Sequence, residues 1–171
     1  MPLHTDQDRL LALVENHKGI LYKVANAYCR NPDDRGDLIQ EIVIQLWLSF
    51  GRYDDRHKFS TWMYRVAINV AISFYRSERR RIREAVPIED SGLEIAVADR
   101  MLEDTGDDIR TLYQLIGQLD ELNRALVLLY LDGYGHDEIA AIVGITSTNV
   151  ATRINRIKQK WQRELDTTQH V

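Results

Sequence analysis

Residues 137–158, DEIAAIVGITSTNVATRINRIK, predict a helix, a short turn and a second helix. Asp137 suits the start of the first helix, and Gly144 suits a left-handed residue that ends it. Thr146 or Ser147 is able to cap the second helix through its hydroxyl oxygen. Two helices with this spacing have the geometry that places the second one in the major groove of DNA.

The second helix of this pair has one apolar face and one polar face. Its apolar residues recur at i, i+4, i+7 and i+11 and form one stripe, which consists of Val150, Ile154, Ile157 and Trp161. The polar face carries Thr148, Thr152, Asn155 and Arg156, with Asn149 and Arg153 at its flank. Such side chains bond to phosphates and base edges. Helix pairs of this kind also occur in ordinary bundles, where the polar face is only solvated.

Composition indicates two small helical modules. The chain has 171 residues, of which 44% are hydrophobic, and this is enough for a core. A single cysteine, Cys29, excludes an internal disulfide and fits a reducing compartment. No apolar run approaches about 18 residues, the length of a membrane span, and no signal peptide is evident. We therefore expect a cytoplasmic protein without membrane insertion.

The net charge of −4 is concentrated in one stretch. Residues 84–108 contain nine acidic residues and one arginine, whereas residues 77–83 contain four arginines and one glutamate. The acidic stretch also contains Pro87, Gly92 and Gly106. It is typical of a linker between two helical halves.

The first half of the chain is predicted to be helical, with apolar positions at Leu10, Leu11, Val14, Ile20, Leu21, Val24, Ala25 and Tyr28. After the break at Asn31-Pro32, a helix over residues 33–50 has an expected core stripe of Ile39, Val43, Leu46 and Phe50. Three further apolar residues, Ile44, Trp47 and Leu48, project to other sides of this helix. On spacing alone, a small bundle covers both faces. The alternative is a docking surface, which Asp37, Gln40 and Glu41 would surround.

A third helix, which starts near Ser60, carries a second nucleic-acid signal. Its expected buried face comprises Phe59, Trp62, Met63, Val66, Val70 and Phe74, and beside that face lie Arg65, Asn69 and Arg76. An arginine cluster follows over residues 79–83. Aromatic rings next to arginine and asparagine are able to stack on splayed bases while they neutralise the backbone. The alternative is that Phe59 and Trp62 only fill the core.

The sequence contains no constellation that indicates an enzyme. Its five histidines are scattered, and none forms a short metal-ligand pair. No glycine-rich phosphate loop is present, and the carboxylate pairs lie in turn-like or linker segments. We therefore expect no catalytic residue, no metal and no cofactor.

The segments DLIQEIVIQLW at 37–47, FSTWMYRVAINVAISFYR at 59–76 and GYGHDEIAAIVGIT at 133–146 together resemble a bacterial sigma factor of the extracytoplasmic-function type. The resemblance covers both halves in the family's order. It implies an all-α fold with a sigma-2-like domain at 1–83, the acidic linker at 84–108 and a sigma-4-like domain at 109–171. This sequence departs from the family pattern at Ser73, where aspartate is common, at Asp120, where proline is common, and at Thr148-Asn149, where Gly-Thr is common.

Carried over by position, the resemblance assigns a role to each polar surface. Binding to the clamp helices of the largest subunit of core RNA polymerase is implied for Asp37, Leu38, Gln40, Glu41, Ile44 and Trp47. Opening and reading of the −10 promoter element is implied for Lys58, Phe59, Ser60, Thr61, Trp62, Arg65, Asn69 and Arg76. Reading of the −35 element is implied for Thr148, Asn149, Thr152, Arg153, Arg156 and Lys158. The core of the second domain is assigned to Leu126, Leu129, Tyr130 and Ile139.

The implied partners are thus core polymerase and promoter DNA, and the family also allows an anti-sigma factor. Two other classes of function stay open on the residues alone. One is a regulator that binds operator DNA without polymerase. The other is a helical interaction module that does not bind DNA.

Overall fold

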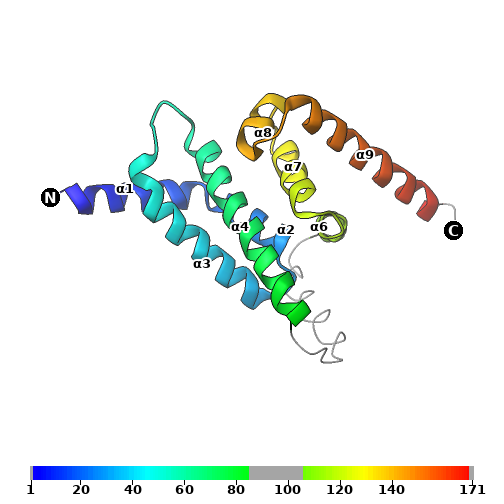
Figure 1. Ribbon diagram of the computed structural model, residues 1–171, viewed down its shortest axis with the longest axis horizontal. Coiled ribbons are helices and arrows are strands. Elements are labelled where there is room, and N and C mark those ends of the chain that lie inside the picture. Colours follow the sequence, from blue (N-terminus) through cyan, green and yellow to red (C-terminus); the bar gives the residue numbers. More distant parts are fainter. Residues whose placement is uncertain (1, 85–105, 170–171) are drawn as a thin grey trace.

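The computed structural model describes residues 2–84 and 106–169, and every regular element in these ranges is a helix. The N-terminal half consists of α1 (Pro2–Asn16), α2 (Lys18–Tyr28), α3 (Pro32–Ser49), the 3-10 turn η1 (Phe50–Arg52) and α4 (Phe59–Glu84). The C-terminal half consists of α6 (Asp107–Gly117), α7 (Glu121–Leu131), α8 (His136–Val143) and α9 (Ser147–Gln169). Helices α7 and α8 lie beside α2 and α4, and α9 points away from the body (Figure 1). The predicted all-helical class is confirmed. Residues 85–105 of the predicted linker lie outside the described ranges.

The turn between α8 and α9 forms as the sequence predicts. Gly144 ends α8 with a φ of +82°, in the left-handed region that favours glycine. Thr146 caps α9, because its hydroxyl oxygen accepts a hydrogen bond from the amide of Asn149 at 3.1 Å. Helix α7 has a similar cap, since the Asp120 carboxylate accepts from the amide of Asn123 at 2.8 Å.

The buried face of α3 differs from the predicted stripe. The fully buried residues are Leu38, Ile42 and Leu46, which follow one another at i, i+4 and i+8. Of the predicted stripe, only Leu46 is fully buried, and the others, Ile39, Val43 and Phe50, are half-buried at its edge. The helix packs against both α2 and α4, so its contact surface is wider than one stripe. The centre of this surface is shifted by about one residue from the predicted stripe.

Helix α4 is also buried on more than its predicted face. Phe59 and Met63 are buried as predicted, but Trp62, Val66, Val70 and Phe74 are only half-buried. The most deeply buried positions after Met63 are Tyr64, Ala67, Ile68 and Ala71. The reason is that α4 contacts α7 and α8 of the other half in addition to α2 and α3.

The core of the C-terminal half follows the predicted periodicity. Val150, Ile154 and Ile157 are buried along α9, and Trp161 is half-buried at the end of the stripe. In α7 and α8, the predicted core residues Leu126, Leu129 and Ile139 are fully buried, whereas Tyr130 is half-buried.

Arg124 of α7 joins the two halves. Its guanidinium, in a side chain that is only 6% exposed, donates to the main-chain oxygens of Gly117 at 2.7 Å, Leu119 at 2.8 Å and Ala27 at 3.1 Å. Its carbon Cζ also lies 4.6 Å from the centre of the Tyr75 ring. Carbonyls at the end of a helix lack intrahelical donors. The Arg124 guanidinium supplies hydrogen-bond donors to carbonyls at the ends of both α2 and α6.

Further polar contacts connect the two halves. Lys23 forms an ion pair of 2.6 Å with Asp132, which also accepts a hydrogen bond from the hydroxyl of Tyr64. The hydroxyl of Tyr28 donates to the main-chain oxygen of Glu121 at 2.5 Å. Burial, and then the hydrogen bond to Asp132, raise the pKa of Tyr64 well above its usual value, so this hydroxyl stays a donor. Hydrogen bonds and an ion pair thus add to the apolar packing between the halves.

Candidate nucleic-acid and partner interfaces

The outer face of α9 presents polar side chains to solvent. Thr148, Thr152, Asn155 and Arg156 are exposed, as predicted, opposite the buried stripe. Asn149 and Arg153 are half-buried at one flank of this face. The helix thus offers the residue types that read base edges and contact phosphates.

Arg153 points into a cleft of about 390 Å³ between α9 and the start of α7. Its Nε donates to the side-chain oxygen of Asn149 at 3.0 Å, and its NH1 donates to that of Asn123 at 3.3 Å. Arg156 and Lys160 line the same cleft. Neither Asn123 nor Lys160 was assigned from the sequence. The periodicity of α9 could have indicated Lys160, which lies seven residues after Arg153, but no local signal indicates Asn123.

Lys158 lies on the other flank of α9. Its ammonium donates to the hydroxyl of Tyr130 at 2.5 Å and lies 4.3 Å from the centre of that ring. The structure therefore places Lys158 apart from the cleft that holds Arg153. Its position suits a contact with a different part of a DNA backbone.

The start of α4 contains a cluster of aromatic rings. The Trp62 ring centre lies 5.2 Å from that of Tyr53, 5.5 Å from that of Phe59 and 6.1 Å from that of Phe50. Trp62 is half-buried and keeps an open side, whereas Phe59 is buried. The assignment of Phe59 to a DNA-contacting surface therefore has to be corrected, because its ring packs inside this cluster and supports Trp62. Around the cluster, Lys58 is exposed, and Ser60 and Thr61 are half-buried.

Two predicted DNA-binding arginines of α4 contact the C-terminal half. Arg65 donates to the main-chain oxygen of Ala141 at 3.3 Å, and Arg76 donates to the Glu121 carboxylate at 3.0 Å. The Glu121 pKa lies below its usual value because a main-chain amide and then Arg76 bond to the carboxylate. Both arginines are exposed. The structure thus gives them protein partners on α8 and α7.

A groove of about 660 Å³ runs between α3 and α4. It brings together four predicted docking residues of α3 and one predicted DNA-binding residue of α4, namely Asp37, Gln40, Glu41, Ile44 and Asn69. Also lining it are Gln45, Val70, Ser73, Phe74 and Ser77, none of which was assigned to an interface from the sequence. The half-burial of Phe74 explains the omission, since its spacing indicates only core.

Large apolar side chains lie exposed on the same helix. Ile44 is 48%, Trp47 44% and Leu48 68% exposed, so the bundle does not cover this face. Leu38, by contrast, is fully buried. Its assignment to the docking surface is wrong, because it points to the bundle axis with Ile42 and Leu46.

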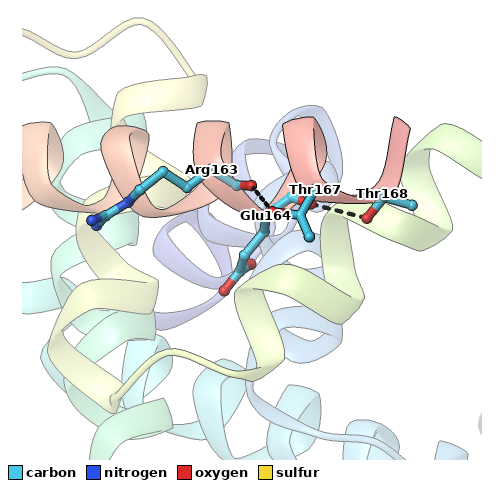
Figure 2. A pocket seen from close by; sticks show the side chains of 4 residues that line it. All are labelled: Arg163, Glu164, Thr167 and Thr168. Atoms are coloured by element: carbon cyan, nitrogen blue, oxygen red, sulfur yellow. Dashed lines mark hydrogen bonds between the residues drawn. The ribbon is translucent and has the colours of Figure 1, made fainter. Parts of the chain in front are cut away.

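A further hollow of about 690 Å³ lies against the distal end of α9 and is lined by Arg163, Glu164, Thr167 and Thr168 (Figure 2). The two threonine hydroxyls donate to main-chain oxygens of their own helix, at 2.8 and 2.9 Å. These hydroxyls are thus engaged within α9, and none of the predicted site residues lies here.

Comparison with known proteins identifies the family. Residues 13–81 match the model of Sigma-70 region 2, and residues 109–160 match that of Sigma-70, region 4. The ECF RNA polymerase sigma factor SigW of Bacillus subtilis is 30% identical over 94% of this chain and 90% of its own. The chain belongs to the extracytoplasmic-function sigma factors. Another relative, the ECF RNA polymerase sigma-E factor of Escherichia coli, is 27% identical over 90% of this chain and 85% of its own.

Solved structures share the fold of this sigma factor. CnrH, in complex with the cytosolic domain of CnrY, aligns with a TM-score of 0.67 and 22% identity over 94% of this chain and 90% of its own. RpoE of Bartonella quintana, in complex with the anti-sigma factor NepR, aligns with a TM-score of 0.65 and 19% identity over 94% of this chain and 96% of its own. Within residues 2–84 and 106–169, none of the helices has the length and apolar character needed to cross a bilayer.

Proposed function

We propose that this sigma factor binds core RNA polymerase through the groove between α3 and α4 and reads promoter DNA through α4 and α9. The observation that carries the proposal is the groove itself, because it joins acidic side chains to exposed apolar ones on a face that the bundle leaves open. Acidic Asp37 and Glu41 beside exposed Ile44 and Trp47 suit a helical partner with basic and apolar residues, such as the polymerase clamp helices.

The −10 element is assigned to the start of α4 and the cations along it. Trp62 keeps an open side on which an unpaired base is able to stack, which would stabilise melted DNA over duplex. Lys58, Ser60 and Thr61 lie next to it and suit the phosphates of that strand. Asn69 lies further along α4, within the docking groove, so we place it where the polymerase and DNA surfaces meet.

The −35 element is assigned to α9. Arg153 and Asn149 are proposed to contact bases, and Arg156 and Lys158 to contact the backbone, while Thr148 and Thr152 line the groove-facing side. Each backbone contact would add salt dependence through counterion release.

The proposed domains follow from these roles: a sigma-2-like domain at 1–83, a linker at 84–108 and a sigma-4-like domain at 109–171. The protein would act in the cytoplasm by binding and not by catalysis. An anti-sigma factor is proposed as a further partner, since the structural relative RpoE was solved with one.

Co-purification with core polymerase, followed by run-off transcription, tests the proposal. Trp47→Ala and Ile44→Glu should lose core binding while their circular dichroism stays helical. Leu11→Ala is the matched control, because Leu11 is an apolar residue of α1 that is 55% exposed. Normal core binding by the two α3 variants, or equal loss by the control, would contradict the docking assignment. DNA binding without polymerase would favour the operator-binding alternative.

A further inference from the structure

The start of α7 lies against the DNA-reading helix, and one chain of hydrogen bonds connects them. We propose that Asn123 and Asp120 are positioning residues, which orient the Arg153 guanidinium for contact with a base pair of the −35 element. This inference rests on the proposed function of α9. It adds two residues outside the helix-turn-helix to the determinants of promoter preference.

The series of hydrogen bonds begins at the N-terminal cap of α7. The Asp120 carboxylate accepts two hydrogen bonds from Asn123, one from the main-chain amide at 2.8 Å and one from the side-chain nitrogen Nδ2 at 3.0 Å. A carboxylate only accepts hydrogen bonds, so it fixes which end of the Asn123 amide faces it. The side-chain oxygen of Asn123 is therefore left facing Arg153, whose NH1 donates to it at 3.3 Å.

A second contact holds Arg153 from its own helix. The side-chain oxygen of Asn149, one turn earlier, accepts from Nε of Arg153 at 3.0 Å. Two of the five N–H donors of the guanidinium thus bond to acceptors on two different helices. The other three donors are left for a ligand. A bidentate contact with guanine needs two of them in one plane.

Such a clamp affects recognition because an arginine side chain otherwise samples many rotamers. A side chain that is already fixed loses less conformational freedom when DNA binds, and its plane is aligned in advance. Contacts from two helices converge on the Arg153 guanidinium, one from Asn149 directly and one from Asp120 through Asn123.

The test is a promoter-library selection with holoenzyme assembled from core polymerase and the full chain. Asn123→Ala should reduce the preference at the position that Arg153 reads by about 2-fold to 13-fold, the equivalent of 0.5–1.5 kcal/mol for one immobilised side chain. Arg153→Ala should reduce it further. In the Arg153→Ala background, Asn123→Ala should have no additional effect, since its action passes through the guanidinium.

Two further variants separate positioning from folding. Asp120→Ser keeps an oxygen that caps α7 but removes the second acceptor for Asn123, so preference should fall while stability to urea is kept. Gln159→Ala, an exposed amide on α9, should leave preference unchanged. If Arg153→Ala itself keeps the parental preference, the proposed base contact is wrong. If Arg153→Ala relaxes preference and Asn123→Ala only lowers stability, the base contact holds and the positioning role is overturned.

Discussion

Replacing Arg124 with methionine should lower the free energy of unfolding by about 3–4 kcal/mol. The guanidinium donates to the main-chain oxygens of Gly117, Leu119 and Ala27 at 2.7 to 3.1 Å. Methionine reaches about as far as the arginine Nε and donates no hydrogen bond, so three acceptors lose their donor, at about 1 kcal/mol each. The lost contact with the Tyr75 ring, 4.6 Å away, would add about 0.5–1 kcal/mol.

An opposing effect has to be weighed. Burying a guanidinium costs free energy, and replacing a buried ion pair by apolar residues is often neutral or stabilising. That outcome requires both partners to be replaced, whereas the acceptors of Arg124 are main-chain carbonyls that no side-chain substitution removes. We therefore expect the loss of the donors to dominate. Arg124→Lys should lie between the parent and Arg124→Met, because one ammonium does not reproduce the planar fork of donors.

Urea unfolding followed by circular dichroism measures the effect, with tryptophan fluorescence as a second probe. Coincident transitions would show that one free energy describes the molecule. Arg156→Met, an exposed arginine of α9, is the control and should change stability by less than about 0.5 kcal/mol. An Arg124→Met variant as stable as the parent would refute the reasoning that this cation satisfies the helix ends.

Three other predictions address the surfaces. Trp62→Ala should reduce promoter melting in a permanganate footprint by an amount equivalent to about 1–3 kcal/mol, with core binding unchanged; an unchanged footprint would return Trp62 to a purely structural role. Lys158→Ala should reduce the slope of log affinity against log salt by about 0.9 when the polymerase holoenzyme is titrated with promoter DNA, and an unaltered slope would exclude a phosphate contact. The main-chain amide and then Arg76 lower the Glu121 pKa in the folded protein, so the stability that these bonds contribute is present above pH 4.5 and is lost as pH falls through the folded-state pKa. Urea unfolding of Glu121→Gln and the parent should differ near about pH 6, and the difference should shrink as pH falls below 4.5, whereas a constant difference would contradict this linkage.

Periodicity within one helix predicted the C-terminal elements well. The start of α8, the turn at Gly144, the start of α9 and the buried stripe from Val150 to Ile157 depend on local spacing and cap chemistry, both of which are visible in the sequence. The resemblance suggested the docking and DNA-binding surfaces, and the structure brings four of the six assigned docking residues into one groove.

Contacts between distant segments could not be predicted in the same way. Leu38 was assigned to the surface although α2 and α4 bury it from two sides. Tyr64 is buried because the other half of the chain covers it. Arg124 and Asn123 are polar residues in a helix, and nothing in their spacing reveals that carbonyls from α2 or a guanidinium from α9 lie opposite them. Their roles depend on tertiary geometry alone.

The partners of Arg65 and Arg76 have a consequence for how tightly α4 can hold DNA. In the structure, Ala141 and Glu121 of the C-terminal half each accept a hydrogen bond from one of these guanidinium groups. The hydroxyl of Tyr134 also lies 3.3 Å from the Ser60 oxygen. A promoter strand that uses the same side chains has to displace acceptors that belong to the same molecule and are therefore present at high effective concentration. The apparent dissociation constant of the −10 surface then equals its intrinsic value divided by the fraction of molecules whose halves are apart. If α4 binds the −10 element as proposed, a partner that separates the halves would tighten that binding without touching the DNA.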